Sequence, residues 1–173
     1  MTQLLLLYGP SGVGKSTIAQ GLASYGFASV ELDYILANTI KKATADLSAE
    51  DIAQLYRVVG TIADHLLPYT HVVVPEWFYR DESADLVLAQ LSKPAEVKIS
   101  HVELMASRQD ILARNKSKKT PIPEDAVLRN FEMMTDLRGK NYIRYDPRPI
   151  MTSAKTSDQV LSELLAYLNL NQG

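Results

Sequence analysis

Residues 9–16 read Gly9-Pro10-Ser11-Gly12-Val13-Gly14-Lys15-Ser16 and fit the pattern G-x-x-x-x-G-K-[ST]. A short apolar run at 4–8 precedes them, and apolar residues at helical spacing follow them. Glycines let the backbone turn so that successive amides converge on one anion, and the N-terminus of the following helix directs its positive end to the same place. The octapeptide therefore predicts a phosphate-binding loop between a buried strand and a helix.

The last two positions of this loop carry its most specific signal. Lys15 is expected to reach the β- and γ-phosphates of a nucleotide, and the Ser16 hydroxyl is expected to ligate Mg²⁺. A turn that only joins a strand to a helix needs the glycines but needs neither of these two side chains. The residues expected to bind the nucleotide are therefore Gly9, Ser11, Gly12, Val13, Gly14, Lys15, Ser16 and Thr17.

Apolar runs and amphipathic segments alternate along the rest of the chain. Strands are expected at 4–8, 27–32, 71–74, 97–104 and 149–152, with Pro75 marking the end of the third. Helices are expected after the loop as far as Gly26, from Ser48-Ala49-Glu50-Asp51 to Pro68, around 86–91, after Ser107, from Pro123, and over 160–168. This alternation predicts an α/β fold in which helices cover both faces of a parallel sheet, and ligands bind beyond the carboxyl ends of its strands.

Composition excludes several classes of protein. The chain has 173 residues, of which 46% are hydrophobic and 22% charged, and this suits one domain over 1–173. Without cysteine it has no disulfide, thiolate nucleophile or Cys-based zinc site, and that fits a reducing cytoplasm. The run at 4–8 is far shorter than the ~20 residues of a membrane span, and residues 1–3 lack the basic start of a signal peptide. We therefore expect a cytoplasmic protein without a membrane partner.

The near-neutral net charge of −2 conceals a local excess of basic residues. Residues 108–148 contain 10 basic and 6 acidic side chains, whereas residues 1–107 are acidic on balance. The chain as a whole lacks the basic character of a nucleic-acid-binding protein. The basic segment leaves room for one local polyanion, and ATP is the best candidate.

The whole chain resembles the small P-loop kinases of the group that contains zeta toxins, chloramphenicol phosphotransferase, polynucleotide kinase, and gluconate or shikimate kinase. Beside the loop, the features that carry the resemblance are Asp33 after the second expected strand, Glu76 after the third, and Arg114 on the helix after the fourth. The resemblance implies a three-layer P-loop NTPase fold, a five-stranded parallel sheet in the order 2-3-1-4-5, and a small lid over ATP at about 114–124. The loop is also similar to that of guanylate kinases, but no GMP-binding segment follows it.

Two carboxylates are expected at the edge of the sheet where the acceptor binds. Asp33 is the expected general base or orienting group for an acceptor hydroxyl, and the alternative is that it caps a helix starting at Tyr34. Glu76 is the expected ligand of a metal-bound water or of the substrate, and the alternatives are a solvated charge or an ion pair with Arg80. Arg80 is itself a candidate ligand for an anionic acceptor. The aromatic run at 77–79 is a candidate wall of the acceptor pocket.

Basic residues after the fourth expected strand are expected to contact phosphate. Arg114 is the candidate clamp for the transferring phosphate, because a guanidinium group matches phosphate oxygens bidentately. Arg108 is expected to assist it, or else only begins its helix from the solvent side. Lys116, Lys118 and Lys119 are expected in the lid and would otherwise form a solvated run. By resemblance, residues 153–156 are a positional candidate for holding adenine.

The function that these features favour is Mg²⁺- and ATP-dependent transfer of the γ-phosphate to a hydroxyl of a small molecule. The alternatives are a nucleoside or nucleotide kinase, a nucleotide-dependent switch, and a polynucleotide 5′-hydroxyl kinase. Polynucleotide kinases carry an arginine three residues after their base, where this chain has Leu36, so a nucleic-acid partner is not expected. His65, His71 and His101 are scattered and indicate no metal site. The sequence predicts neither the acceptor nor the oligomeric state.

Overall fold

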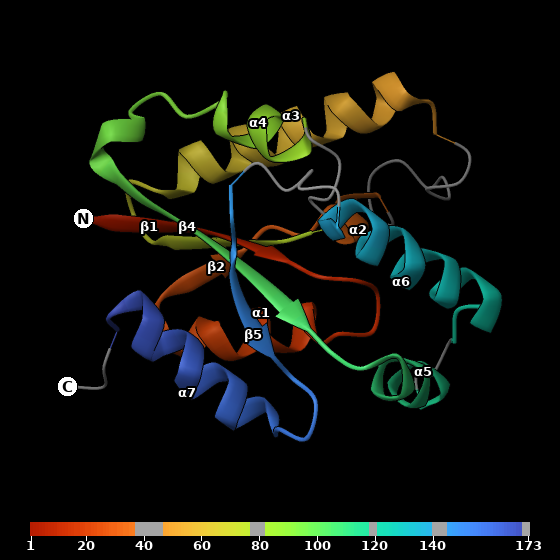
Figure 1. The fold of residues 1–173 in the computed structure, drawn as a ribbon. Helices are drawn as coiled ribbons and strands as arrows, with labels where there is room; N and C mark the ends of the chain where they lie inside the picture. Colours follow the sequence, from red (N-terminus) through yellow and green to blue (C-terminus); the bar gives the residue numbers. More distant parts are fainter. Residues whose placement is uncertain (37–46, 77–81, 118–120, 140–144, 171–173) are drawn as a thin grey trace.

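A computed structural model describes residues 1–36, 47–76, 82–117, 121–139 and 145–170 of the chain. Five parallel strands form one sheet in the order β2-β3-β1-β4-β5 (Figure 1). The strands are β1 (Thr2–Tyr8), β2 (Phe27–Ser29), β3 (His71–Pro75), β4 (Val97–Met105) and β5 (Arg148–Met151). The expected α/β class and strand order are therefore confirmed.

Helices cover both faces of this sheet. They are α1 (Lys15–Leu22), α2 (Leu32–Ile35), α3 (Ala49–Leu66), α4 (Ser83–Leu88), α5 (Arg108–Lys116), α6 (Glu124–Gly139) and α7 (Ser157–Leu168), with short 3-10 turns η1 (Ala23–Tyr25) and η4 (Pro94–Glu96). α3 and α4 lie on one face and α1 and α7 on the other, while α5 and α6 gather near the edge where the strands end (Figure 1). Within the described residues, no helix has the length and apolar character that a membrane span requires.

The hydrophobic core has two parts because neighbouring side chains of β1 point to opposite faces of the sheet. Leu5 and Leu7 pack with buried residues of α1 and α7. Leu4 and Leu6 pack with buried residues of α3 and α4. All four leucines have no exposed surface, so the apolar run that precedes the loop is buried on both faces as expected.

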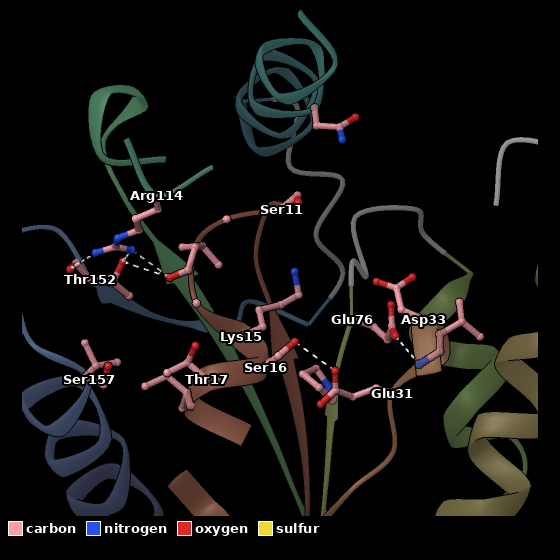
Figure 2. Close-up of a pocket in the computed structure, with 18 of the residues that line it drawn as sticks. Ser11, Lys15, Ser16, Thr17, Glu31, Asp33, Glu76, Arg114, Thr152 and Ser157 are labelled. Carbon is pink, nitrogen blue, oxygen red and sulfur yellow. Dashed lines mark hydrogen bonds between the residues drawn. The ribbon is translucent and has the colours of Figure 1, made fainter. Parts of the chain in front are cut away.

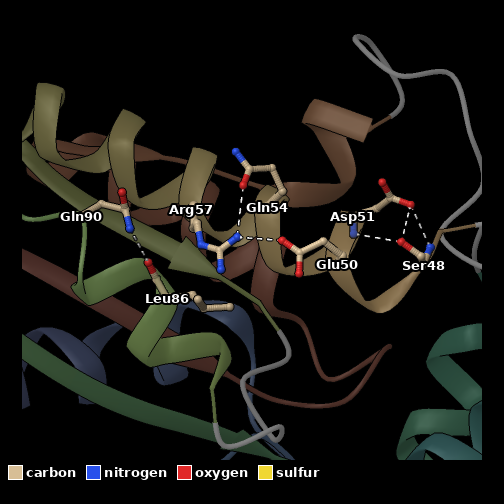
Figure 3. A network of polar contacts seen from close by, with 7 residues as sticks. All are labelled: Ser48, Glu50, Asp51, Gln54, Arg57, Leu86 and Gln90. Carbon is tan, nitrogen blue, oxygen red and sulfur yellow. Dashed lines mark hydrogen bonds and ion pairs between the residues drawn. The ribbon is translucent and has the colours of Figure 1, made fainter.

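The expected start of α3 is confirmed by a side-chain cap. The Ser48 and Asp51 side chains form a reciprocal capping box at the start of α3. Arg57 extends this polar surface by donating to Glu50 and Gln54, at 3.2 and 3.1 Å (Figure 3). Since this polar row lies on the exposed face of α3, the opposite face is directed to the sheet.

The second strand is shorter than the sequence predicts. β2 ends at Ser29, whereas we expected a strand over 27–32, and α2 begins at Leu32. The Leu32 amide donates to Glu76 Oε1 at 2.7 Å instead of extending the ladder. Leu32 is buried, so the apolar pattern was correct but its final member belongs to a helix. The predicted end of this strand was wrong because the Leu32 amide bonds to Glu76, a side chain at the end of β3, and not to a backbone carbonyl of a neighbouring strand.

Gly60 of α3 lies against the backbone of α4, and we expect Gly60→Ala to destabilise the fold by about 1–3 kcal/mol. A Cβ at this position would lie 2.4 Å from the carbonyl oxygen of Val87. The ~1 kcal/mol gain in helix propensity does not offset that overlap, because a backbone atom cannot move aside cheaply. Urea unfolding measures the change.

The matched control is Gly21→Ala in α1. There an added Cβ would meet Leu161 Cδ2, the flexible end of a side chain, at 3.0 Å. We expect its free energy of unfolding to stay within about 1 kcal/mol of the parent value. Equal losses at both positions would contradict the close contact between α3 and α4.

A half-buried, neutral histidine lies on the α3/α4 side of the sheet. His101 Nδ1 is 2.8 Å from the Tyr8 hydroxyl, and the His101 ring stacks on Tyr145 with centroids 4.4 Å apart. Tyr145 donates in turn to Asp85 of α4. Burial lowers the pKa of His101 to about 4, and burial, followed by the charges of Tyr145 and Asp85, raises the pKa of Tyr8. The cluster therefore ties β1, β4 and α4 together in its uncharged form.

The depressed pKa of His101 predicts a loss of stability in mild acid. The unfolded histidine, with a pKa of 6.5, binds a proton before the folded one does, so this contribution is complete above pH 6.5 and is lost as the pH falls towards 4. Because solvent screens the partly exposed ring of His101, we expect about 1 kcal/mol less stability at pH 5 than at pH 7. Burial also lowers the pKa of His71, which adds to the loss in the same direction.

Urea unfolding at the two pH values tests this expectation with matched variants. His101→Gln should reduce the pH dependence of the unfolding free energy. His65→Gln on the exposed side of α3 should leave it intact, because the hydrogen bond that His65 forms is with the Thr61 carbonyl of its own helix. An unchanged pH dependence in His101→Gln would contradict the prediction.

Candidate functional site

A cavity of about 1150 Å³ opens at the edge where the parallel strands end. Its walls come from the phosphate loop, the β2–α2 turn, α3, the end of β3, the start of α4, α6, and the β5–α7 turn. Segments that are far apart in the sequence meet here because right-handed crossovers bring all the strand ends to one edge. The cavity therefore lies beyond the carboxyl ends of the strands, where the sequence predicts the ligand site.

The phosphate loop has the backbone geometry that its glycines predict. Gly12 and Gly14 have φ angles of +87° and +107°, a region that side-chain-bearing residues rarely adopt. Lys15 arches back across the loop, where its Nζ donates to the carbonyls of Gly9 at 2.8 Å and Pro10 at 3.3 Å. The lysine is thus held over the loop in the position from which it can meet a bound phosphate.

Glu31 joins this site although the sequence analysis did not select it. The Ser16 hydroxyl donates to Glu31 Oε2 at 3.0 Å (Figure 2). The Ser29 hydroxyl donates to Oε1 of the same carboxylate at 3.2 Å. The sequence does have two acidic residues, Glu31 and Asp33, at the end of an expected strand, but we predicted a functional role for Asp33 alone. A carboxylate that touches the loop serine is the better candidate for the metal.

The oxygen atoms of Ser16 and Glu31 fit a magnesium ion. Mg²⁺ prefers hard oxygen ligands, keeps several waters, and is commonly held by one or two protein groups together with substrate phosphates. The residues that the structure describes contain no group of three or more His, Cys, Asp or Glu that could hold a metal ion. The donor set suits an ion that arrives with a nucleotide.

Glu76 and Asp33 lie on the same side of the cavity in different settings. Glu76 Oε1 accepts the Leu32 amide at 2.7 Å and so holds the start of α2. Asp33 lies in the first turn of α2, is exposed, and lines the cavity (Figure 2). The alternative that Asp33 caps the helix is wrong, because Glu31 occupies the N-cap position. Arg80 and the aromatic run at 77–79 lie outside the described residues.

Arg114 lies on the opposite side, where it fixes the base of the loop. Its guanidinium donates to the Val13 carbonyl at 3.1 Å, and to the Thr152 hydroxyl and carbonyl at 2.8 Å each. These contacts use three of its five N–H donors and join α5, the phosphate loop and the end of β5. The contact between Arg114 and Thr152 could not be found from sequence spacing. Arg108 is exposed at the start of α5 and is absent from the cavity wall.

The segment expected to form the lid is closed at its base by one buried side chain. Asn115 donates to the Ile122 carbonyl at 2.7 Å and accepts the Ile122 amide at 3.1 Å. Lys116 forms an ion pair with Glu124 at 3.5 Å. Because both side chains are exposed, this pair adds little to the stability of the fold. Lys118 and Lys119 lie outside the described residues. Beyond this base, α6 contributes Asn130, Met133 and Leu137 to the cavity, and no motif in the sequence indicated them.

The β5–α7 turn forms the remaining wall. Thr152, Lys155, Thr156, Ser157 and Val160 line the cavity there, next to Arg114. Two of the residues proposed by position to hold adenine, Lys155 and Thr156, thus reach the cavity. Lys155 is paired with Glu163 of α7 at 2.5 Å, which fixes its position on the wall.

A comparison with families of known proteins places this architecture among P-loop proteins. The family model described as "AAA domain" matches residues 4–139, which is most of the chain. No curated protein matches significantly.

Solved structures with similar folds include three that are described as kinases. A sugar kinase from Janibacter sp. HTCC2649 has a TM-score of 0.74 at 16% identity, over 98% of this chain and 96% of that one. A gluconokinase from Sinorhizobium meliloti 1021 has a TM-score of 0.69 at 19% identity, over 96% and 91%. The adenosine phosphosulfate (APS) kinase of Mycobacterium tuberculosis, in complex with AMPPNP and APS, has a TM-score of 0.65 at 19% identity, over 97% and 98%. The fold and the resemblance to this group are both confirmed.

Proposed function

The chain belongs to the AAA domain family of P-loop proteins, and on that basis we propose that it is a kinase that transfers the γ-phosphate of ATP to a hydroxyl of a small molecule, with Mg²⁺. One observation carries the proposal: a single cavity contains both the phosphate loop and, facing it, the exposed carboxylate of Asp33. A nucleotide switch needs the loop but has no use for a carboxylate directed into a space beyond it. The kinase folds of the similar structures support the same reading.

In the proposed reaction the residues of the chain align two substrates and neutralise charge. The amides of the loop and Lys15 Nζ hold the β- and γ-phosphates, and Lys15 exchanges its contacts with the Gly9 and Pro10 carbonyls for phosphate oxygens. Asp33 accepts the proton of the acceptor hydroxyl as that oxygen bonds to the γ-phosphorus. The bond between the γ-phosphorus and the β–γ bridging oxygen breaks, so the products are ADP and a phosphate monoester.

Four further residues position these groups. Ser16 and Glu31 would hold Mg²⁺, which when bound neutralises charge on the β- and γ-phosphates. Glu76 holds the first turn of α2, and with it Asp33, through the Leu32 amide. Arg114 keeps the loop seated against Thr152, and two of its N–H donors make no hydrogen bond with the residues that the structure describes, so they can meet the nucleotide.

The proposal is tested by following ADP release from Mg-ATP in the presence of a panel of sugars, nucleosides, hydroxy acids and antibiotics. Stimulation by one acceptor, together with phosphate on its hydroxyl by mass spectrometry, is the expected result. Slow hydrolysis that no acceptor stimulates, but that a protein partner changes, would favour a nucleotide switch instead. Stimulation by a nucleic-acid 5′ end would assign the acceptor to a different class.

Glu31→Gln is expected to weaken the apparent Mg²⁺ affinity of the reaction by about 10- to 100-fold. The amide keeps the size of the side chain, but it removes the charge next to Ser16. Turnover at saturating Mg²⁺ should recover in large part. A Mg²⁺ titration at fixed ATP measures the shift.

The control for this titration is Glu50→Gln, which removes a carboxylate from the exposed face of α3 and should leave the Mg²⁺ dependence unchanged. The same Mg²⁺ midpoint in Glu31→Gln as in the parent protein would contradict the metal role of Glu31.

A further inference from the structure

Val13 is a point at which the rest of the fold holds the phosphate loop. Its side chain is 1% exposed and packs in the part of the core that α1 and α7 cover. Its amide donates to the Pro10 carbonyl at 3.3 Å, and its carbonyl accepts Arg114 Nη1 at 3.1 Å. The residues on either side, Gly12 and Gly14, both have positive φ angles. Val13 is therefore a fixed residue between two conformationally permissive ones.

The peptide bond between Val13 and Gly14 links this fixed point to the cavity. It is trans, and a planar trans peptide directs its carbonyl oxygen and its N–H to opposite sides. Because the Val13 carbonyl is directed to Arg114, the Gly14 N–H is directed away from it. Gly14 lines the cavity and is the N-cap residue of α1. Since glycine lets this peptide rotate at little cost, the direction of the N–H depends on what holds the carbonyl.

Thr152 fixes that contact from the end of the sheet. Its side chain is 3% exposed, and its amide donates to the Met105 carbonyl at 2.7 Å, next to the paired strands β4 and β5. Its hydroxyl accepts Arg114 Nη1 at 2.8 Å, the nitrogen that also donates to Val13, and its carbonyl accepts Nη2 at 2.8 Å (Figure 2). The hydroxyl donates in turn to the Val13 carbonyl at 3.4 Å. Two contacts on one rigid guanidinium group leave Arg114 little freedom of orientation.

We infer, building on the proposed function, that Thr152 is a positioning residue for the bound phosphates. Its hydroxyl orients Arg114, and both groups hold the Val13 carbonyl, so the Gly14 amide is preorganised before a nucleotide binds. Without the hydroxyl the peptide gains freedom, and binding must then supply the free energy that orders it. The phosphate loop thus depends on a residue of β5 that lies 139 positions away in the chain.

Thr152→Val tests this role, because valine has nearly the shape of threonine but no hydroxyl. Calorimetry on the full chain measures the binding of Mg-AMPPNP and of Mg-tripolyphosphate, which presents phosphates without a base or a sugar. We expect both affinities to fall about tenfold, in the range for a lost hydrogen bond to a charged group. Thr152→Ser keeps the hydroxyl and should stay within about threefold of the parent affinities.

A double-mutant cycle tests whether Thr152 acts through Arg114. Residues that work as one unit have non-additive effects, so adding Thr152→Val to Arg114→Ala should weaken tripolyphosphate binding by no more than about twofold. Arg114→Lys examines the same contact with Thr152 intact, which covers the case in which Thr152→Val does not fold. Lysine keeps the charge but lacks the planar fork, so we expect a loss of about tenfold there too.

The matched control is Thr70→Val, the same substitution at the opposite end of the strands. The Thr70 hydroxyl donates to the Gly26 carbonyl at 2.6 Å across 44 residues, and neither residue lines the cavity. Urea unfolding of both valine variants measures their losses of stability. Thr70→Val should leave the affinity for both ligands unchanged. Equal losses of affinity in the two variants would show a general loosening of the fold and overturn the inference.

The remaining outcomes separate the role of Thr152 from the proposed function. Parental tripolyphosphate affinity in Thr152→Val or in Arg114→Lys overturns the inference, as do additive effects in the cycle or a loss in Thr152→Ser equal to that in Thr152→Val. A loss confined to AMPPNP also overturns it, because Thr152 would then contact the nucleoside. A parent chain that binds neither ligand overturns both proposals. The expected losses of binding, in a chain that phosphorylates no acceptor, support the role of Thr152 and overturn the kinase proposal alone.

Discussion

Lys15→Ala is expected to lower phosphoryl transfer by about 100- to 1000-fold, the range found when one preorganised donor to developing charge is removed. In the folded chain Lys15 Nζ is already held over the loop by the carbonyls of Gly9 and Pro10, so it can pass to phosphate oxygens without a large search. Negative charge develops on the β–γ bridging oxygen in the transition state, as its bond to the γ-phosphorus breaks. We therefore expect kcat to fall more than the affinity for ATP.

Steady-state ADP release with the best acceptor of the panel gives kcat, and thermal stabilisation by Mg-ATP reports nucleotide binding. Lys93→Ala is the control and should leave both quantities unchanged, because that exposed lysine pairs with Glu96 and neither residue lines the cavity. The midpoint of unfolding without nucleotide must be compared as well, since Lys15→Ala removes two hydrogen bonds within the loop. If Lys15→Ala retains both parental turnover and parental stabilisation by ATP, the nucleotide site itself is wrong.

The features that sequence predicts well are those whose physical causes lie within a few residues. The geometry of the loop at 9–16 can be predicted from its own residues, because glycines at fixed spacing stand between a strand and the start of a helix. Ser48 and Asp51, three residues apart, form the expected capping box for the same reason. The strand order was also predictable, but through the resemblance to P-loop kinases and not through local chemistry.

The features that sequence missed depend on contacts between distant residues. The bond from Leu32 to Glu76 spans 44 residues, and it decides both where β2 gives way to a helix and how Glu76 is used. Arg114 and Thr152 are 38 residues apart, so their contact could not be predicted. We expected Arg114 to bind phosphate alone, whereas in the structure it also holds the phosphate loop. Met133 lines the cavity only because α6 lies near the strand ends. In each case a local pattern predicted the residue's importance or its helix, but tertiary packing decided which distant residue it contacts.

This distinction also explains why Glu31 was overlooked in favour of Asp33. Two acidic residues at alternate positions after a strand look equivalent in sequence. The structure separates them, because Glu31 accepts the Ser16 hydroxyl while Asp33, in the first turn of α2, lines the cavity. One carboxylate is thereby associated with the metal side of the phosphate loop and the other with the acceptor. The difference between their roles can be tested by removing each charge separately.

Asp33→Asn is expected to lower kcat by about 100- to 10,000-fold, the range for loss of a positioned general base. The amide has nearly the same shape, and the turn that carries it stays fixed by the bond between Leu32 and Glu76, so the fold and ATP binding should be retained. The Mg²⁺ midpoint should also stay near the parent value, in contrast to Glu31→Gln. Single-turnover transfer to the best acceptor measures the chemical step.

The control must separate proton transfer from the general effect of an acidic residue near a helix N-terminus. Asp158 serves this purpose, because it also lies in the first turn of a helix, α7, but does not line the cavity. Asp158→Asn changes the same charge relative to a helix dipole and should leave transfer intact. Near-normal turnover in Asp33→Asn would remove this residue from the reaction and leave Glu76 as the carboxylate to test on the acceptor side. A loss confined to Asp33→Asn, with ATP binding and Mg²⁺ dependence unchanged, is the result that a base acting on the acceptor hydroxyl requires.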